Sequence, residues 1–121
     1  MKKIISRQNE TIKRIKSLEK RKYREKHAEI ILEGYRLIKD AVENGLNIKT
    51  ILFVDSIDEK KISLVETLSA SGTEAIETDL AVFGHVCETV ASQGLLAVAE
   101  MPSNPLKKTI GDSPDLVIFL D

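Results

Sequence analysis

The clearest structural signal in the sequence is Glu29-Ile30-Ile31-Leu32-Glu33-Gly34, an apolar run that ends on an acid and a glycine. Its three aliphatic side chains are consecutive, so both faces of an extended segment would need cover, as in the central strand of a parallel sheet. After Gly34 the pattern changes to helical spacing, with Ile38, Ala41 and Val42 on one side. A buried strand followed by an amphipathic helix is the first half of a βαβ unit.

The chain beyond this unit repeats the alternation of strand and helix. Continuous apolar runs predict strands at 50–55 and 95–99, and a shorter run predicts one at 74–76. Residues that can cap or end helices lie between these runs: Gly45, Ser56 or Asp58, Gly72 and Asp79. The alternation predicts an α/β fold, a three-layer α/β/α sandwich with a mainly parallel sheet.

Charge is divided unevenly along the chain. Residues 1–26 contain 11 Lys and Arg against 3 acids, whereas the remainder contains 7 against 16. Asn9 can cap a basic helix that continues to about Tyr23, with Ile12, Ile15 and Leu18 along one narrow side. Three acids are too few for the Glu-to-Lys pairing of a purely structural helix, which favours contact with phosphate groups. The predicted contact residues are Lys13, Lys16, Lys20, Arg21, Lys22 and Arg24. As exposed charges they should contribute little to stability.

Composition also suggests where the chain of 121 residues is divided. We interpret residues 1–26 as a basic N-terminal helical arm and residues 27–100 as an α/β domain. The three prolines of the sequence all fall within 101–115, which indicates a linker. The apolar run 116–121 is a strand candidate with no crossover after it, so we expect it to be the first strand of a truncated second domain.

Several kinds of site are unsupported. The sequence contains neither G-x-x-x-x-G-K-[ST] nor G-x-G-x-x-G, and we assign no catalytic or cofactor-binding residue to this chain. His27, His85 and Cys87 lack the paired spacing of a zinc site, so no metal is expected. The single cysteine cannot form an internal disulfide, and no stretch approaches the roughly 20 apolar residues of a membrane span. A cytoplasmic location without membrane association is therefore expected.

The order and spacing of these elements resemble the substrate-binding domain that precedes the catalytic domain in SpoU/TrmH-family RNA 2'-O-ribose methyltransferases. The matching residues are Ser6, Asn9, Ile12-Lys13, Leu18, Arg24, Leu32-Glu33-Gly34, Leu52-Phe53-Val54, Gln93-Gly94-Leu95-Leu96-Ala97-Val98 and Leu116-Val117-Ile118-Phe119-Leu120-Asp121. The resemblance spans essentially the whole chain. Ser92 departs from it, because the family commonly has proline before Gln-Gly.

The resemblance implies a fold similar to that of kink-turn-binding ribosomal proteins and a role in holding structured RNA, rRNA rather than tRNA. Glu33 and Gln93 join the basic residues as RNA-binding candidates. The resemblance further implies that the intact protein is a homodimeric, S-adenosylmethionine-dependent rRNA or tRNA 2'-O-ribose methyltransferase whose cofactor binds outside this chain. The chain itself is then expected to be monomeric and non-catalytic.

Two other functions stay open. One is a protein-interaction adaptor whose basic helix meets an acidic protein. The other is a small independent α/β enzyme, which would need polar side chains at the carboxyl ends of strands. Glu33, Asp55 and Gln93 are the candidates there, and they include no nucleophile or base pair.

Overall fold

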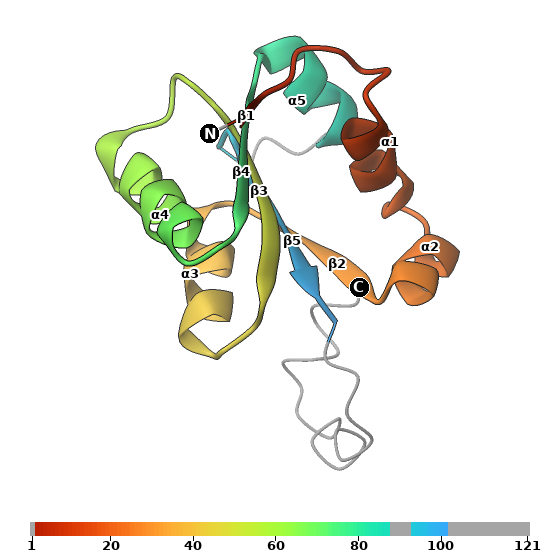
Figure 1. The fold of residues 1–121 in the computed structure, drawn as a ribbon, viewed down its shortest axis with the longest axis horizontal. Coiled ribbons are helices and arrows are strands. Elements are labelled where there is room, and N and C mark those ends of the chain that lie inside the picture. The colour runs from red at the N-terminus through yellow and green to blue at the C-terminus, as the bar shows by residue number, and fades with distance from the viewer. Residues whose placement is uncertain (1, 88–92, 102–121) are drawn as a thin grey trace.

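The computed structural model describes residues 2–87 and 93–101 of the chain (Figure 1). The helices in this part are α1 (Glu10–Ser17), α2 (Arg21–His27), α3 (Tyr35–Glu43), α4 (Glu59–Ala70) and α5 (Leu80–Val86). The strands are β1 (Lys2–Lys3), β2 (Glu29–Glu33), β3 (Ile48–Val54), β4 (Glu74–Thr78) and β5 (Leu95–Glu100). The predicted strand 116–121 and the predicted linker, apart from Met101, lie outside the described residues.

The described strands form one sheet in the order β1-β4-β3-β5-β2. Strand β4 pairs in parallel with β1 and β3, while β5 is antiparallel to both of its neighbours, β3 and β2. Four of these five strands therefore run in one direction. Helices α3 and α4 cover one face of the sheet, and α1 and α5 cover the other (Figure 1). The predicted α/β/α sandwich with a mainly parallel sheet is confirmed.

The position of β2 differs from the prediction of a central strand. In the described sheet β2 lies at one edge and pairs with β5 alone. Its apolar run is explained by helices instead, because α3 contacts β2 and lies on one side of the sheet while α2 contacts it near the other (Figure 1). Ile30 and Leu32, on one face, are fully buried, and Ile31, on the other, is partly buried against the core. A continuous apolar run thus indicates that other elements pack against both faces of a strand, and this can be true of an edge strand as well.

The predicted helix caps are present. The side chains of Asn9, Asp58 and Asp79 accept hydrogen bonds from backbone N–H groups in the first turns of α1, α4 and α5, at 2.8, 3.0 and 2.8 Å. Each cap satisfies a donor that has no partner within its own helix. Gly45 ends α3 in the left-handed region, at φ 83°.

The N-terminal segment is more closely integrated than an arm. Strand β1 extends the sheet beside β4, and Ile4, Ile12, Ile15 and Leu18 belong to the same core cluster as the central strands. The predicted single helix to about Tyr23 is wrong, because the chain breaks into α1 and α2. At the break Leu18 ends α1 and is buried, and the backbone of Lys20 is extended.

Glu29 connects α1 to the sheet through ion pairs. Its carboxylate is the first side chain of β2, and only 4% of it is exposed. The same oxygen, Oε2, contacts Arg14 of α1 at 2.9 Å and Lys49 of β3 at 2.8 Å. A buried carboxylate is tolerated because these two cations compensate it.

Within residues 2–87 and 93–101, no helix is long and apolar enough to cross a membrane. The same residues contain no group of three or more His, Cys, Asp or Glu side chains that could hold a metal ion.

Candidate nucleic-acid interface

The RNA-binding candidates fall into two separate groups. Lys13, Lys16, Lys20, Arg21 and Lys22 lie on α1, α2 and the turn between them, and we call them the α1–α2 basic surface. Helix α2 leads into the first residue of β2, whereas Glu33 is the last residue of that strand. Gln93 lies two positions before β5, whose first residues pair opposite the end of β2. Glu33 and Gln93 therefore lie at the other end of β2 from α2.

The α1–α2 basic surface contains both paired and unpaired cations. Lys16 pairs with Glu19 at 2.9 Å, and Arg21 pairs with Glu25 at 3.1 Å. Lys22 lies over the ring of Tyr23, 5.0 Å from its centroid. Lys13 and Lys20 are exposed and have no ion-pair partner among the described residues. These two lysines are the cations most available to a phosphate.

Arg24 is not the exposed charge that the sequence predicted. It is half-buried, and its Nη1 donates to the carbonyl oxygens of Leu18 and Glu19 at 3.0 and 2.9 Å. These carbonyls lie just after α1, where the helix leaves its last acceptors without partners. The guanidinium therefore holds α2 against the end of α1.

Replacing Arg24 with alanine should lower the free energy of unfolding by about 1.5–3 kcal/mol, because two hydrogen bonds from a charged donor are lost. In a domain of this size that corresponds to a fall in melting temperature of about 6–20 °C, measurable by circular dichroism. Arg21→Ala is the matched control. Its side chain is 82% exposed, and its loss should change stability by less than about 0.5 kcal/mol. Equal melting temperatures for the two variants would contradict this role.

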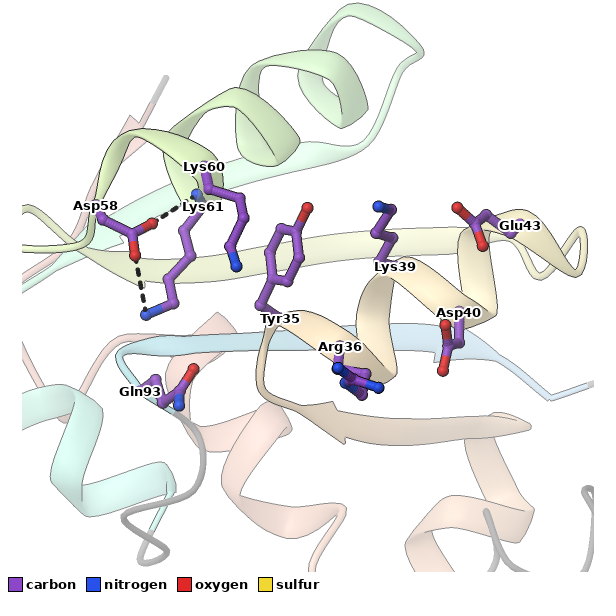
Figure 2. A pocket seen from close by; sticks show the side chains of 9 residues that line it. All are labelled: Tyr35, Arg36, Lys39, Asp40, Glu43, Asp58, Lys60, Lys61 and Gln93. Carbon is purple, nitrogen blue, oxygen red and sulfur yellow. Dashed lines mark hydrogen bonds and ion pairs between the residues drawn. The ribbon is translucent and has the colours of Figure 1, made fainter.

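A second polar surface lies between α3 and α4. It is an open groove of about 690 Å³, which we call the α3–α4 groove (Figure 2). The groove is lined by the cations Arg36, Lys39, Lys60 and Lys61, the acids Asp40, Glu43 and Asp58, and the polar side chains of Tyr35 and Gln93. Of the residues predicted from sequence as RNA contacts, Gln93 alone lines it. Asp55, the additional candidate of the enzyme hypothesis, is exposed just after β3.

The ring of Tyr35 is the centre of the α3–α4 groove. Lys60 Nζ lies 4.6 Å from the ring centroid and Lys39 Nζ lies 5.8 Å from it. Asp58 is occupied by its own helix: it accepts from the Lys61 N–H at 3.0 Å and pairs with Lys61 Nζ at 3.7 Å. The backbone N–H of Lys61, assisted by nearby lysine charges, lowers the pKa of Asp58, so this carboxyl stays ionised at neutral pH.

An unusual backbone conformation places Gln93 beside the α3–α4 groove. Gln93 and Gly94 both have positive φ, at 55° and 80°. A Cβ on Gly94 would lie 2.7 Å from Val54 Cγ2 and 3.1 Å from Ile57 Cγ2, so only glycine fits against these side chains. This packing sets the place of the preceding residue, Gln93, beside the groove (Figure 2).

The sequence alone did not predict a site that contains Tyr35, Arg36, Lys39, Lys60 and Lys61. They come from two helices that follow different strands, and no local pattern links them. The available signal was indirect. Both helices have polar faces and both follow strands of one parallel set, so their first turns were expected at one edge of the sheet.

The fold and these surfaces define a small α/β/α binding domain with two cation-rich surfaces and, in the part that the structure describes, no cluster of metal ligands. The family model of the MRM3-like substrate binding domain matches residues 9–97. The chain belongs to this family. The resemblance to SpoU/TrmH-family methyltransferases seen in the sequence is thereby confirmed.

Individual relatives support the same family assignment. The chain is 31% identical over 85 residues to rRNA methyltransferase 3, mitochondrial, of Xenopus tropicalis, which covers 69% of this chain and 20% of that protein. The AdoMet-bound rRNA methyltransferase of Sinorhizobium meliloti superposes with a TM-score of 0.73 at 23% identity, over 88% of this chain and 39% of that one. The SpoU methyltransferase AviRb of Streptomyces viridochromogenes, in complex with AdoMet, gives 0.67 at 25% identity, over 83% and 36%. The chain spans only a part of each relative.

Proposed function

We propose that this chain is the RNA-binding, substrate-holding domain of an rRNA 2'-O-ribose methyltransferase, and that it does not itself transfer a methyl group. Membership of a substrate-binding family supports the first part. The observation that carries RNA binding is the pair of exposed, unpaired lysines, Lys13 and Lys20, on the α1–α2 basic surface. Cations without protein partners lose little when they exchange water and counterions for phosphates.

The methyl donor of the intact protein would be S-adenosylmethionine, which two of the solved relatives contain. The α3–α4 groove offers the positive sulfonium of this cofactor little attraction, because its four cations outnumber its three acids. We therefore assign the cofactor, and the homodimer contact, to the part of the intact protein that lies outside this chain. Preference for rRNA over tRNA, a monomeric state of the chain and a cytoplasmic location are parts of the same proposal.

The proposal predicts a salt-dependent affinity for RNA. The logarithm of the association constant should fall with the logarithm of salt concentration, with a slope of about −0.7 to −0.9 per phosphate contacted. Lys13→Gln combined with Lys20→Gln should flatten the slope by about 1.4–1.8, since two contacts are removed. Fluorescence anisotropy of a labelled RNA stem–loop, measured between about 50 and 200 mM salt, provides both slopes.

The matched control is Lys2→Gln combined with Lys3→Gln. It changes the net charge equally, but these lysines lie on β1 and pair with Glu74 and Glu77. The control should keep the wild-type slope. Equal flattening by both double variants would show that net charge, not the α1–α2 basic surface, binds the RNA. Displacement of the RNA by polyglutamate at equal charge concentration would favour an acidic protein partner instead.

A further inference from the structure

The α3–α4 groove has features that phosphate contact alone does not require. Tyr35 is only partly buried, although it packs against the core, and it lies between Lys60 of α4 and Lys39 of α3 (Figure 2). Lys39 and Lys60 form no ion pair with another described residue, and the ammonium group of each lies over the Tyr35 ring. An aromatic surface flanked by two available cations suits a ligand that is both flat and anionic.

The geometry points to a site for one unpaired RNA nucleotide in the α3–α4 groove, with its base stacked on Tyr35 and its phosphate contacted by Lys60. This inference rests on the proposed function and names the form of RNA that the domain distinguishes. A groove of about 690 Å³ is within the range of small-molecule sites, whereas an RNA double helix cannot enter it. The nucleotide must therefore be unpaired.

Stacking on Tyr35 requires a lysine to leave one face of the ring. Lys39 is the farther of the two, at 5.8 Å against 4.6 Å for Lys60. Stacking of a base on an aromatic ring is worth more than an exposed cation–π contact, so the exchange favours the base. The displaced ammonium group stays close enough to contact the sugar-phosphate backbone.

Charge in the groove is arranged along its length. Lys60, Lys61 and Gln93 lie at the Tyr35 end together with Asp58, whose charge is paired with Lys61, while Asp40 and Glu43 lie toward the far end of α3 (Figure 2). A phosphate is therefore favoured beside Tyr35 and disfavoured farther along the helix. The Gln93 amide can both donate and accept hydrogen bonds, which is what recognition of a base edge requires.

An acidic peptide fits these features less well. It would use the lysines but would gain nothing from the partly buried tyrosine ring between them. Base stacking also tolerates any sequence, because every base has a flat face. The inferred site therefore selects unpaired RNA over duplex RNA.

The test compares an RNA stem–loop that has unpaired loop nucleotides with a blunt RNA duplex of the same length, using the 121-residue chain. Tyr35→Leu keeps an apolar side chain against the core and removes the stacking ring. It should weaken stem–loop binding about 5- to 150-fold and leave duplex binding unchanged. Tyr35→Phe keeps the ring and should bind both RNAs as the wild type does. Melting temperatures of all three proteins establish that they fold.

Lys60→Gln provides a second, independent measurement, because an exposed lysine can be replaced without loss of the fold. It should flatten the salt slope for the stem–loop by about 0.7, the value for one single-strand phosphate, and not the slope for the duplex. Wild-type stem–loop affinity in Tyr35→Leu, or an equal loss for both RNAs, would overturn the inference while RNA binding stands. Failure of both RNAs to bind the wild-type chain would instead overturn the proposed function.

Discussion

Gly94→Ala is expected to lower the free energy of unfolding by about 2–5 kcal/mol. The φ of 80° costs an L-residue about 1–2 kcal/mol, and a Cβ placed 2.7 Å from Val54 Cγ2 overpacks the site at a further cost of about 1–3 kcal/mol. Val54 and Ile57 are buried, so neither side chain can move freely away. Urea unfolding of the purified domain measures the loss.

Gly45→Ala separates the two causes. Gly45 has a similar φ of 83°, but a Cβ there meets nothing within 4 Å. This control should cost only about 1–2 kcal/mol, the backbone contribution alone. If both variants lost the same stability, close packing of Gly94 against the core would play no part, and the placement of Gln93 would have to be explained differently.

Glu29→Gln should cost about 2–3 kcal/mol. The neutral amide leaves Arg14 and Lys49 without a compensating charge, and removal of one member of a buried ion pair costs about 3–5 kcal/mol. The expected loss is smaller here because the Arg14 and Lys49 side chains are 49% and 41% exposed and can be hydrated. A cavity of about 260 Å³ beside Glu29, Arg14 and Lys49 adds room for water.

Glu74→Gln makes the same chemical change at the surface. Its carboxylate contacts Lys2 at 2.7 Å, a distance shorter than either contact of Glu29, but 43% of the Glu74 side chain is exposed. The expected cost is less than about 1 kcal/mol, as for other exposed pairs. Chemical denaturation of both variants compares them directly. A loss at Glu74 equal to that at Glu29 would show that contact distance, not burial, determines the contribution of these carboxylates.

Much of the fold could be predicted because its signals are local. Asn9, Asp58 and Asp79 cap their helices through donors two or three residues away, so a short stretch of sequence contains both partners. The features that were missed depend on distant partners. Strand β1 is only Lys2 and Lys3, and it exists because β4 offers a parallel neighbour.

The same distinction applies to the candidate site. The packing of α2 against the end of α1 involves Arg24, which bonds carbonyls five and six residues earlier, and helical periodicity does not predict that contact. The basic residues of the first 26 positions could be recognised from composition. The α3–α4 groove could not be recognised from composition. Tyr35 and Lys60 come together only after β2 and β3 have paired on either side of β5, which sets the distance between α3 and α4.

The order of the strands also has a consequence for synthesis. Strand β5 lies between β2 and β3, yet it is the last described strand to be made. Residues 34–94 separate β2 from β5, and at about 5–20 residues per second a ribosome needs about 3–12 s to make them. During those seconds β2 has no strand neighbour from the described sheet, and its backbone hydrogen-bonding groups face no partner strand. The nascent chain therefore has to keep β2 from aggregating until Glu100 has left the ribosome.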